Sequence, residues 1–166
     1  MQTVRDNTRS SGVEHSMVIT LNPETATITS RITNEVGTNT SIDFVYTPEA
    51  DSGVPLDSDG GQNQVLGLNV VLGQVHGHPK TTTPGMQNQP GTSTNDENTA
   101  NASGATIYAI DSYNGRNAGV SADIHRVTPD RTHTNNVGKT IGNRTAPGAG
   151  QFNIGLDALQ KTGGRR

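Results

Sequence analysis

Short runs of alternating apolar and small polar residues, separated by polar loops rich in glycine, proline and asparagine, make up most of the chain. Residues 17–21 and 26–33 flank an Asn-Pro-Glu-Thr turn at 22–25, which predicts a β-hairpin. The longest apolar run, 65–75, contains two glycines and four valines, so we expect one strand or two short ones. Further strands are expected at 41–46, 105–111 and 120–127.

Two segments carry helix signals. Ser93 is a predicted N-cap, followed by a short helix over 94–103 that ends at Gly104. A closing helix is expected over 154–162. Loops are predicted at 47–64, 80–91 and 128–150, with turns at 37–40 and 114–115. The fold class is therefore α+β, with a mixed, mostly antiparallel β-sheet and short flanking helices.

The length of 166 residues fits one domain. Residues 1–12 are polar and are interpreted as a tail or linker, 13–163 as a single domain, and 164–166 as a tail. Hydrophobic residues are only 29% of the chain, so the core is expected to be modest and the loops long. The apolar residues are clustered, which argues against full disorder.

Charge and composition exclude several function classes. The net charge is −3, and basic residues gather only at the C-terminal end, which is a poor footprint for nucleic-acid binding. No apolar run is long enough to span a membrane, and we expect no signal peptide in this chain. The chain has no cysteine, so a bound metal would need histidine and carboxylate ligands.

Such ligands occur at the end of the longest apolar run, as His76-Gly77-His78-Pro79. Side chains alternate along a strand, so both imidazoles are expected on the same side, within reach of one ion. Pro79 should end strand pairing and leave the pair at a rim that opens to solvent. Alternatively, these are two surface histidines in a loop.

Asp96, in Ser93-Thr94-Asn95-Asp96, is the candidate third ligand. The same four residues have the form of a capping box, in which Ser93 and Asp96 satisfy helix N-terminal amides. In the first helical turn, Asp96 would face the strand end that carries the histidines. Two histidines and one aspartate leave the fourth zinc position for water, as in catalytic sites.

Other candidates have simpler explanations. His125 in a strand and His133 in a loop could each be a metal ligand, but lone histidines are more often surface or hydrogen-bonded residues, and we interpret both in that way. Asp111 is interpreted as a turn former. Residues 148–150, Gly-Ala-Gly, lack the lysine and the flanking strand of a phosphate-binding loop.

The order of glutamate, H-x-H-P, S-x-x-D, glycine and an aromatic-bearing strand resembles the JAB/MPN metalloenzyme (JAMM) family. The closest similarity is to JAB-like domains at the C-terminal ends of bacterial polymorphic toxins. The resemblance covers residues 13–128 and is carried by 14–19, 76–79, 93–96 and 104–108. It implies a cytidine-deaminase-like JAB/MPN architecture.

The resemblance also implies roles for individual residues. His76, His78 and Asp96 would bind Zn²⁺, Glu14 would be the general acid/base, and Ser93 would hydrogen-bond the oxyanion. The segment 80–92 is longer than the family usually has, so it is either an insertion that shapes substrate access or a sign that Asp96 is the wrong acid. Glu14 lacks the glycine that commonly follows it, so Glu35 and Glu49 are alternative bases.

The implied function is that of a zinc-dependent peptidase or isopeptidase, acting as the effector domain of a secreted bacterial toxin. Its partners would be a protein or peptide substrate and a cognate immunity protein, and it would be secreted or delivered into a target cell. Two alternatives remain, a non-catalytic binding module of the same fold and a metal-dependent nuclease toxin. The negative charge disfavours the nuclease.

Overall fold

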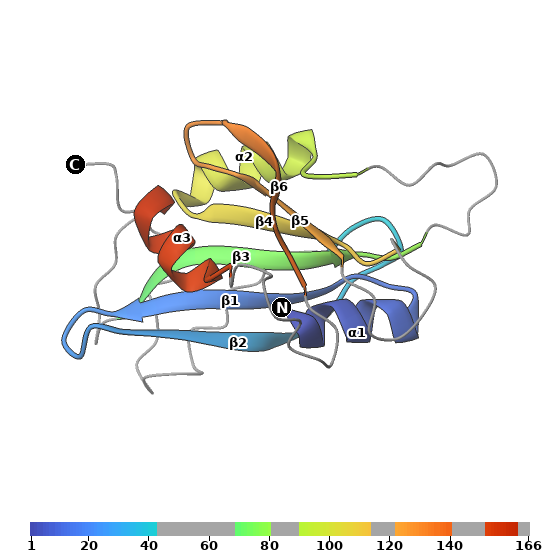
Figure 1. Cartoon of the computed structure of the whole chain (residues 1–166), viewed down its shortest axis with the longest axis horizontal. Helices are drawn as coiled ribbons and strands as arrows, with labels where there is room; N and C mark the ends of the chain where they lie inside the picture. Colours follow the sequence, from blue (N-terminus) through green and yellow to red (C-terminus); the bar gives the residue numbers. More distant parts are fainter. Residues whose placement is uncertain (43–68, 81–89, 114–121, 141–151, 163–166) are drawn as a thin grey trace.

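A computed structural model describes residues 1–42, 69–80, 90–113, 122–140 and 152–162. These residues form an α+β domain with a six-stranded mixed sheet and three helices (Figure 1). The elements are α1 (Gln2–Ser11), β1 (His15–Asn22), β2 (Thr27–Val36), β3 (Val70–His78), α2 (Thr94–Ser103), β4 (Thr106–Asp111), β5 (Asp123–Val127), β6 (His133–Lys139) and α3 (Ile154–Thr162).

The strand order in the sheet is β2-β1-β3-β4-β5-β6. Four of the five neighbouring pairs are antiparallel, and β3 and β4 alone are parallel within this sheet. A parallel pair needs a crossover connection, and α2 lies in the connection between β3 and β4. The predicted fold class and the predominance of antiparallel pairing are confirmed.

The two faces of the sheet are covered by different helices. On β3, a Cβ added at Gly73 would contact Ala158 of α3, and one added at Gly77 would contact Thr8 of α1. These two positions lie on one face of the strand, so α1 and α3 share that face. On the other face, Ala100 of α2 packs with Ile107 and Val127 in a small apolar cluster. The main core lies under α1 and α3 and includes Val4, Met17, Ile19, Val75, Tyr108, Ile110, Ile124 and Ala158.

Several elements lie where the sequence predicts them. The hairpin of β1 and β2, the strand β4 and the helices over 94–103 and 154–162 are confirmed. The predicted caps of α2 are also present, with Ser93 at the N-cap and Gly104 in the left-handed conformation at the C-cap. The strand β3 ends at His78, directly before Pro79.

The interpretation of residues 1–12 as a tail or linker is wrong, because 2–11 form helix α1. Its buried side chains are Val4, Arg5 and Thr8, so hydrogen-bonded polar groups do much of the packing. The Arg5 guanidinium donates to Thr140 Oγ1 at 3.2 Å, and the backbone N–H of His15 donates to Thr8 Oγ1 at 3.3 Å. Residues 2–11 therefore form a packed helix even though most of their side chains are polar.

The loop expected over 128–150 is also wrong in part, because 133–139 form the edge strand β6. This strand is polar and mostly exposed, and Asn136 has a φ of 55°. It therefore lacks the alternation of buried and exposed residues from which strands are predicted.

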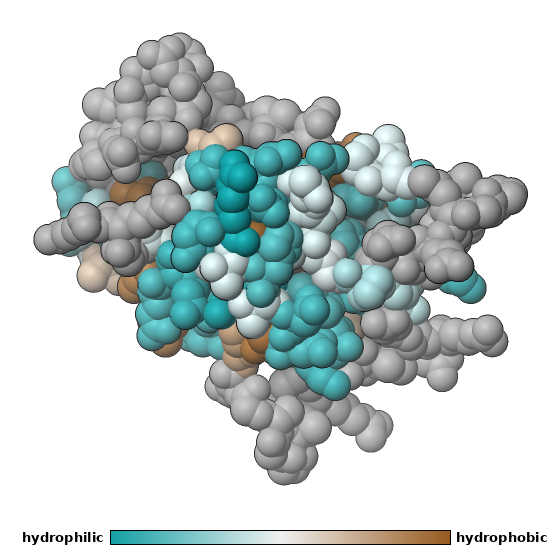
Figure 2. All heavy atoms as spheres, turned by 90° about the horizontal axis from the view of Figure 1, so that it is seen from above, coloured by the Kyte–Doolittle hydropathy of each residue, from teal (hydrophilic) through white to brown (hydrophobic). Residues whose placement is uncertain are grey.

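Other predictions lie outside the described residues. They are most of the strand at 41–46, the loop at 47–64, the first part of the run 65–75, most of the loop at 80–91, the turn at 114–115, the Gly-Ala-Gly segment and the C-terminal tail. Within the described part of the chain, no helix combines the length and the apolar character that a membrane crossing requires. The described surface in Figure 2 is mainly hydrophilic, with apolar atoms in small separate areas.

Candidate metal centre

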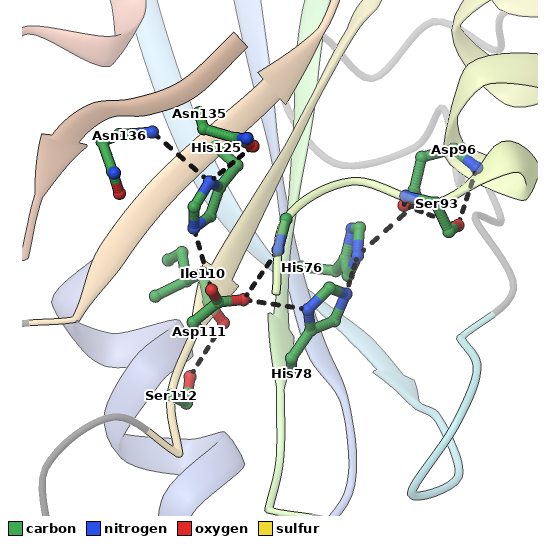
Figure 3. A network of polar contacts seen from close by, with 11 residues as sticks. His76, His78, Ser93, Asp96, Ile110, Asp111, Ser112, His125, Asn135 and Asn136 are labelled. Atoms are coloured by element: carbon green, nitrogen blue, oxygen red, sulfur yellow. Dashed lines mark hydrogen bonds and ion pairs between the residues drawn. The ribbon is translucent and has the colours of Figure 1, made fainter. Parts of the chain in front are cut away.

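The two histidines of β3 lie side by side at the carboxyl end of the strand. Their Nε2 atoms are 3.0 Å apart and their ring centroids 4.8 Å apart (Figure 3). His76 is buried and His78 is partly buried. The prediction that both imidazoles project to the same side is confirmed. Gly77 between them is required because α1 packs closely on the opposite side, where a Cβ would collide with Thr8.

Asp96 reaches this pair from the first turn of α2. Its Oδ1 lies 3.6 Å from His76 Nε2. Its Oδ2 accepts hydrogen bonds from the Ser93 backbone N–H at 2.7 Å and from the Ser93 hydroxyl at 2.8 Å, which completes a capping box. The two interpretations of Asp96 are therefore compatible, because one carboxylate oxygen caps the helix and the other faces the histidines.

The three side chains could hold a metal ion. Within the part of the chain that the structure describes, they offer donor atoms that all lie within 4.8 Å of one another. With zinc bonds of 2.0–2.1 Å in a tetrahedron, ligand atoms are about 3.3 Å apart. The observed 3.0 and 3.6 Å separations around His76 Nε2 bracket that value. The group as a whole extends to 4.8 Å, so the three donors would have to move closer together to bind one ion.

Burial and neighbouring charges set the protonation of these groups. Burial lowers the pKa of His76 to about 4, which leaves its ring neutral at neutral pH, as metal binding requires. Burial alone would raise the pKa of Asp96, but His76 and the hydrogen bonds from Ser93 lower it. Burial alone would lower the pKa of His78, but its hydrogen bond to Asp111 and the nearby carboxylates raise it.

Glu14 directly precedes β1 and is buried, with 6% of its surface exposed. Its backbone is fixed by two hydrogen bonds, from its N–H to Thr38 O and from Gly37 N–H to its carbonyl. Burial raises the pKa of its carboxyl to about 7; the charge of Asp96 adds to this rise and that of His78 opposes it. The Glu14 carboxyl is therefore close enough to the donor group for the charges of His78 and Asp96 to act on it. Of the alternative bases, Glu49 lies outside the described residues and so does the side chain of Glu35.

Ser93 is exposed and its hydroxyl is already used for capping. Its Oγ donates to Asp96 Oδ2 and accepts from the Asp96 backbone N–H at 3.2 Å. To donate to an oxyanion, the hydroxyl would have to release the Asp96 carboxylate. The oxyanion role of Ser93 stays a prediction.

Asp111 and His125 are not among the site residues predicted from the sequence, but both belong to the hydrogen-bond network that includes His78 (Figure 3). Asp111 is buried at the end of β4, and His78 Nδ1 donates to its Oδ1 at 3.2 Å. His125 Nε2 donates to its Oδ2 at 2.8 Å. The interpretation of Asp111 as a turn former is therefore incomplete, whereas that of His125 as a hydrogen-bonded histidine is confirmed.

A sequence signal for Asp111 did exist. The carboxyl ends of two parallel strands meet at one edge of a sheet, and His78 pairs with Asp111 in the register of β3 and β4. An aspartate that ends the strand after the crossover helix is therefore a candidate neighbour of a histidine that ends the strand before it.

His133 lies outside this network. It contacts Glu97 Oε2 through Nε2 at 3.1 Å and Thr92 Oγ1 through Nδ1 at 2.8 Å, and it is exposed. The interpretation of His133 as a surface histidine is confirmed.

No protein-family model, curated protein or solved structure matches this chain.

Proposed function

We propose that the domain is a zinc-dependent peptidase or isopeptidase of the JAMM type. The observation that carries this proposal is a buried glutamate, Glu14, in the electrostatic environment of a group formed by His76, His78 and Asp96. Structural zinc sites use four protein ligands, whereas catalytic sites use three and leave the fourth position to water, which a nearby carboxylate that does not bind the metal can deprotonate. Among the residues that the structure describes, the group has three donors and one such carboxylate nearby, which favours catalysis over structure.

Zinc fits this donor set better than the hard cations do. Magnesium and calcium prefer oxygen ligands, and two of the three donors here are imidazole nitrogens. When bound, zinc would act as a Lewis acid that polarises a carbonyl and makes water a better nucleophile at neutral pH. His76, His78 and Asp96 would hold it.

The protein's own groups would handle the protons. With a pKa of about 7, Glu14 is present in both protonation states near neutral pH. It would take a proton from the attacking water and return it to the leaving amine, which is the task of a general acid/base. The Ser93 hydroxyl would release its hydrogen bond to Asp96 Oδ2 and donate one to the oxyanion instead. The reaction that combines these roles is hydrolysis of an amide or isopeptide bond.

The JAB/MPN architecture and the effector role belong to the same proposal. They are supported by the order of Glu14, His76-Gly77-His78, Ser93 and Asp96 along the chain, which resembles JAB-like toxin domains. On this basis the domain would be secreted or delivered as part of a larger effector, act on a protein or peptide and be neutralised by an immunity protein. A sheet whose parallel pair β3–β4 is crossed by α2 is compatible with that architecture.

Zinc analysis tests the proposal directly. We expect protein purified without a His tag to contain about one equivalent of zinc, and His76→Ala and Asp96→Asn to lose most of it. His133→Ala is the matched control, because this exposed histidine lies outside the donor group and its loss should leave the zinc content unchanged. A zinc content far below one equivalent that is the same in His76→Ala would refute the metal site.

Activity separates the enzyme from a binding module of the same fold. Glu14→Gln keeps the size of the side chain and removes its acid/base function, so it should keep zinc and lose toxicity on expression in a host cell. A Glu14→Gln variant that binds zinc and is as toxic as the wild type would favour the non-catalytic module.

A further inference from the structure

The Asp111 carboxylate joins parts of the site that come from three separate segments of the chain. Its Oδ1 accepts hydrogen bonds from His78 Nδ1 at 3.2 Å and from the backbone N–H of Gly91 at 3.3 Å. His125 Nε2 lies on its Oδ2 at 2.8 Å. The residue is 1% exposed, so water has little access to compete for these bonds.

We propose that Asp111 and His125 are positioning residues of the metal centre, which orient the His78 ring and fix the loop that leads to Asp96. This inference rests on the proposed metal site. Neither residue is among the three grouped donors, and each acts through other groups.

The first action of Asp111 is on the His78 ring. A carboxylate has no hydrogen to offer, so the proton in their bond is on His78 Nδ1. In a neutral ring the lone pair then lies on Nε2, the atom that faces His76 Nε2. Carboxylates that hold the second nitrogen of a ligating histidine in this way set its tautomer and orientation.

The second action is on the loop before α2. Gly91, held by Asp111, is two residues before the N-cap Ser93, so its position sets where the capping box begins. Gly91 has a φ of +83°, and a Cβ there would be 3.0 Å from Asn135 Oδ1 and 3.6 Å from the His125 ring. The loop is therefore packed against the same network that holds His78. Asp111 therefore holds both His78 on β3 and the loop that positions Asp96 on α2.

His125 in turn fixes Asp111. Its Nε2–H occupies Oδ2 of the carboxylate, which leaves Oδ1 directed toward His78 and Gly91. On its other side, His125 Nδ1 lies 3.1 Å from Asn135 Oδ1 and 3.3 Å from the backbone nitrogen of Asn136 in β6. Hydrogen-bond contacts therefore connect β6 to the donor His78 through His125 and Asp111 (Figure 3).

Zinc affinity, measured by competition with a chromophoric chelator, tests the inference. We expect Asp111→Asn to weaken zinc binding about 10–100-fold, because carboxylates of this kind have effects of that size. His125→Ala should give a smaller loss, and His125→Gln should restore affinity because its amide N–H can donate to Asp111 Oδ2. Asp123→Asn is the matched control: this carboxylate lies on β5, pairs with Lys139 and should leave affinity unchanged.

Two spectroscopic measurements distinguish positioning from a loss of folding. The absorption spectrum of the Co²⁺-substituted protein should change in Asp111→Asn if the His78 ring is displaced. In metal-free protein, at a pH at which the ring is neutral, ¹⁵N NMR should find the Nδ1–H tautomer of His78 in the wild type and a mixture in Asp111→Asn.

The outcomes separate this inference from the proposed function. If the wild type binds zinc and Asp111→Asn binds it equally well with an unchanged Co²⁺ spectrum, the positioning role is refuted and the metal site stands. If the wild type binds no zinc, the proposed function fails. The NMR tautomer then decides the role of Asp111, and an unchanged His78 tautomer in Asp111→Asn would refute it.

Discussion

Replacing Glu14 with glutamine should change how the stability of the metal-free protein depends on pH. Burial raises the pKa of this carboxyl from 4.5 to about 7 in the folded state. Between these two values the folded protein holds a proton that the unfolded chain has released, so stability falls as pH rises. Each pKa unit is worth about 1.4 kcal/mol, so the full loss is about 3 kcal/mol.

Glu14→Gln resembles the protonated carboxyl at every pH. Below pH 4.5 the variant and the wild type should therefore have similar free energies of unfolding, and above pH 7 the variant should be more stable by up to about 3 kcal/mol. The difference between the two proteins is the quantity to follow. His76, whose pKa is lowered to about 4, makes stability rise with pH over part of the same range and would mask the effect in the wild type alone.

Urea denaturation in the presence of a chelator, repeated across this pH range, measures the difference. Glu24→Gln is the control for the loss of a carboxylate, because Glu24 is exposed in the hairpin turn. Adding zinc should shrink the effect of Glu14→Gln, since a nearby cation favours the charged form of the glutamate. A stability difference that is constant with pH, or that grows toward acid, would refute the assignment of a buried, proton-holding Glu14.

Two further substitutions test the local structure around the site. Ser93→Ala should lower the free energy of unfolding by about 1 kcal/mol through loss of the helix cap, and Ser93→Thr, which can still cap, should recover most of it in the same urea titration. Gly91→Ala should cost about 1–2 kcal/mol, because its φ of +83° disfavours a side chain, and Gly12→Ala, with nothing within 4 Å of the added Cβ, measures the backbone part alone. Equal losses at Gly91 and Gly12 would show that contacts with Asn135 and His125 add nothing.

Elements with explicit end signals could be predicted from the sequence, and those held by polar packing could not. Ser93 and Gly104 bound α2 where expected, because capping depends on residues within one turn of the helix end. Helix α1 cannot be predicted in this way, because it contributes Val4 to the core and otherwise buries Arg5 and Thr8, whose partners are distant in sequence. No local pattern reports such partners.

The candidate site divides in the same way. His76, His78 and Asp96 lie close to a helix or strand end that the sequence marks, so their proximity could be anticipated. Asp111 also ends a strand that the sequence marks, but its place beside His78, like that of His125, depends on the order of strands in the sheet, which places β4 between β3 and β5.

The charges around the donor set explain why a cation suits this position. Asp96 and Asp111 are ionised at neutral pH, since hydrogen bonds and neighbouring histidines lower the pKa of both, that of Asp111 to about 2. Glu14 adds a third carboxyl whose ionisation is opposed by burial and by the charge of Asp96. A divalent cation between the histidines and Asp96 would offset the negative charge of these carboxylates and favour the ionised form of Glu14. Metal binding and the ionisation of Glu14 would therefore be coupled through charge, while Asp96 Oδ2 caps α2 and Oδ1 faces His76.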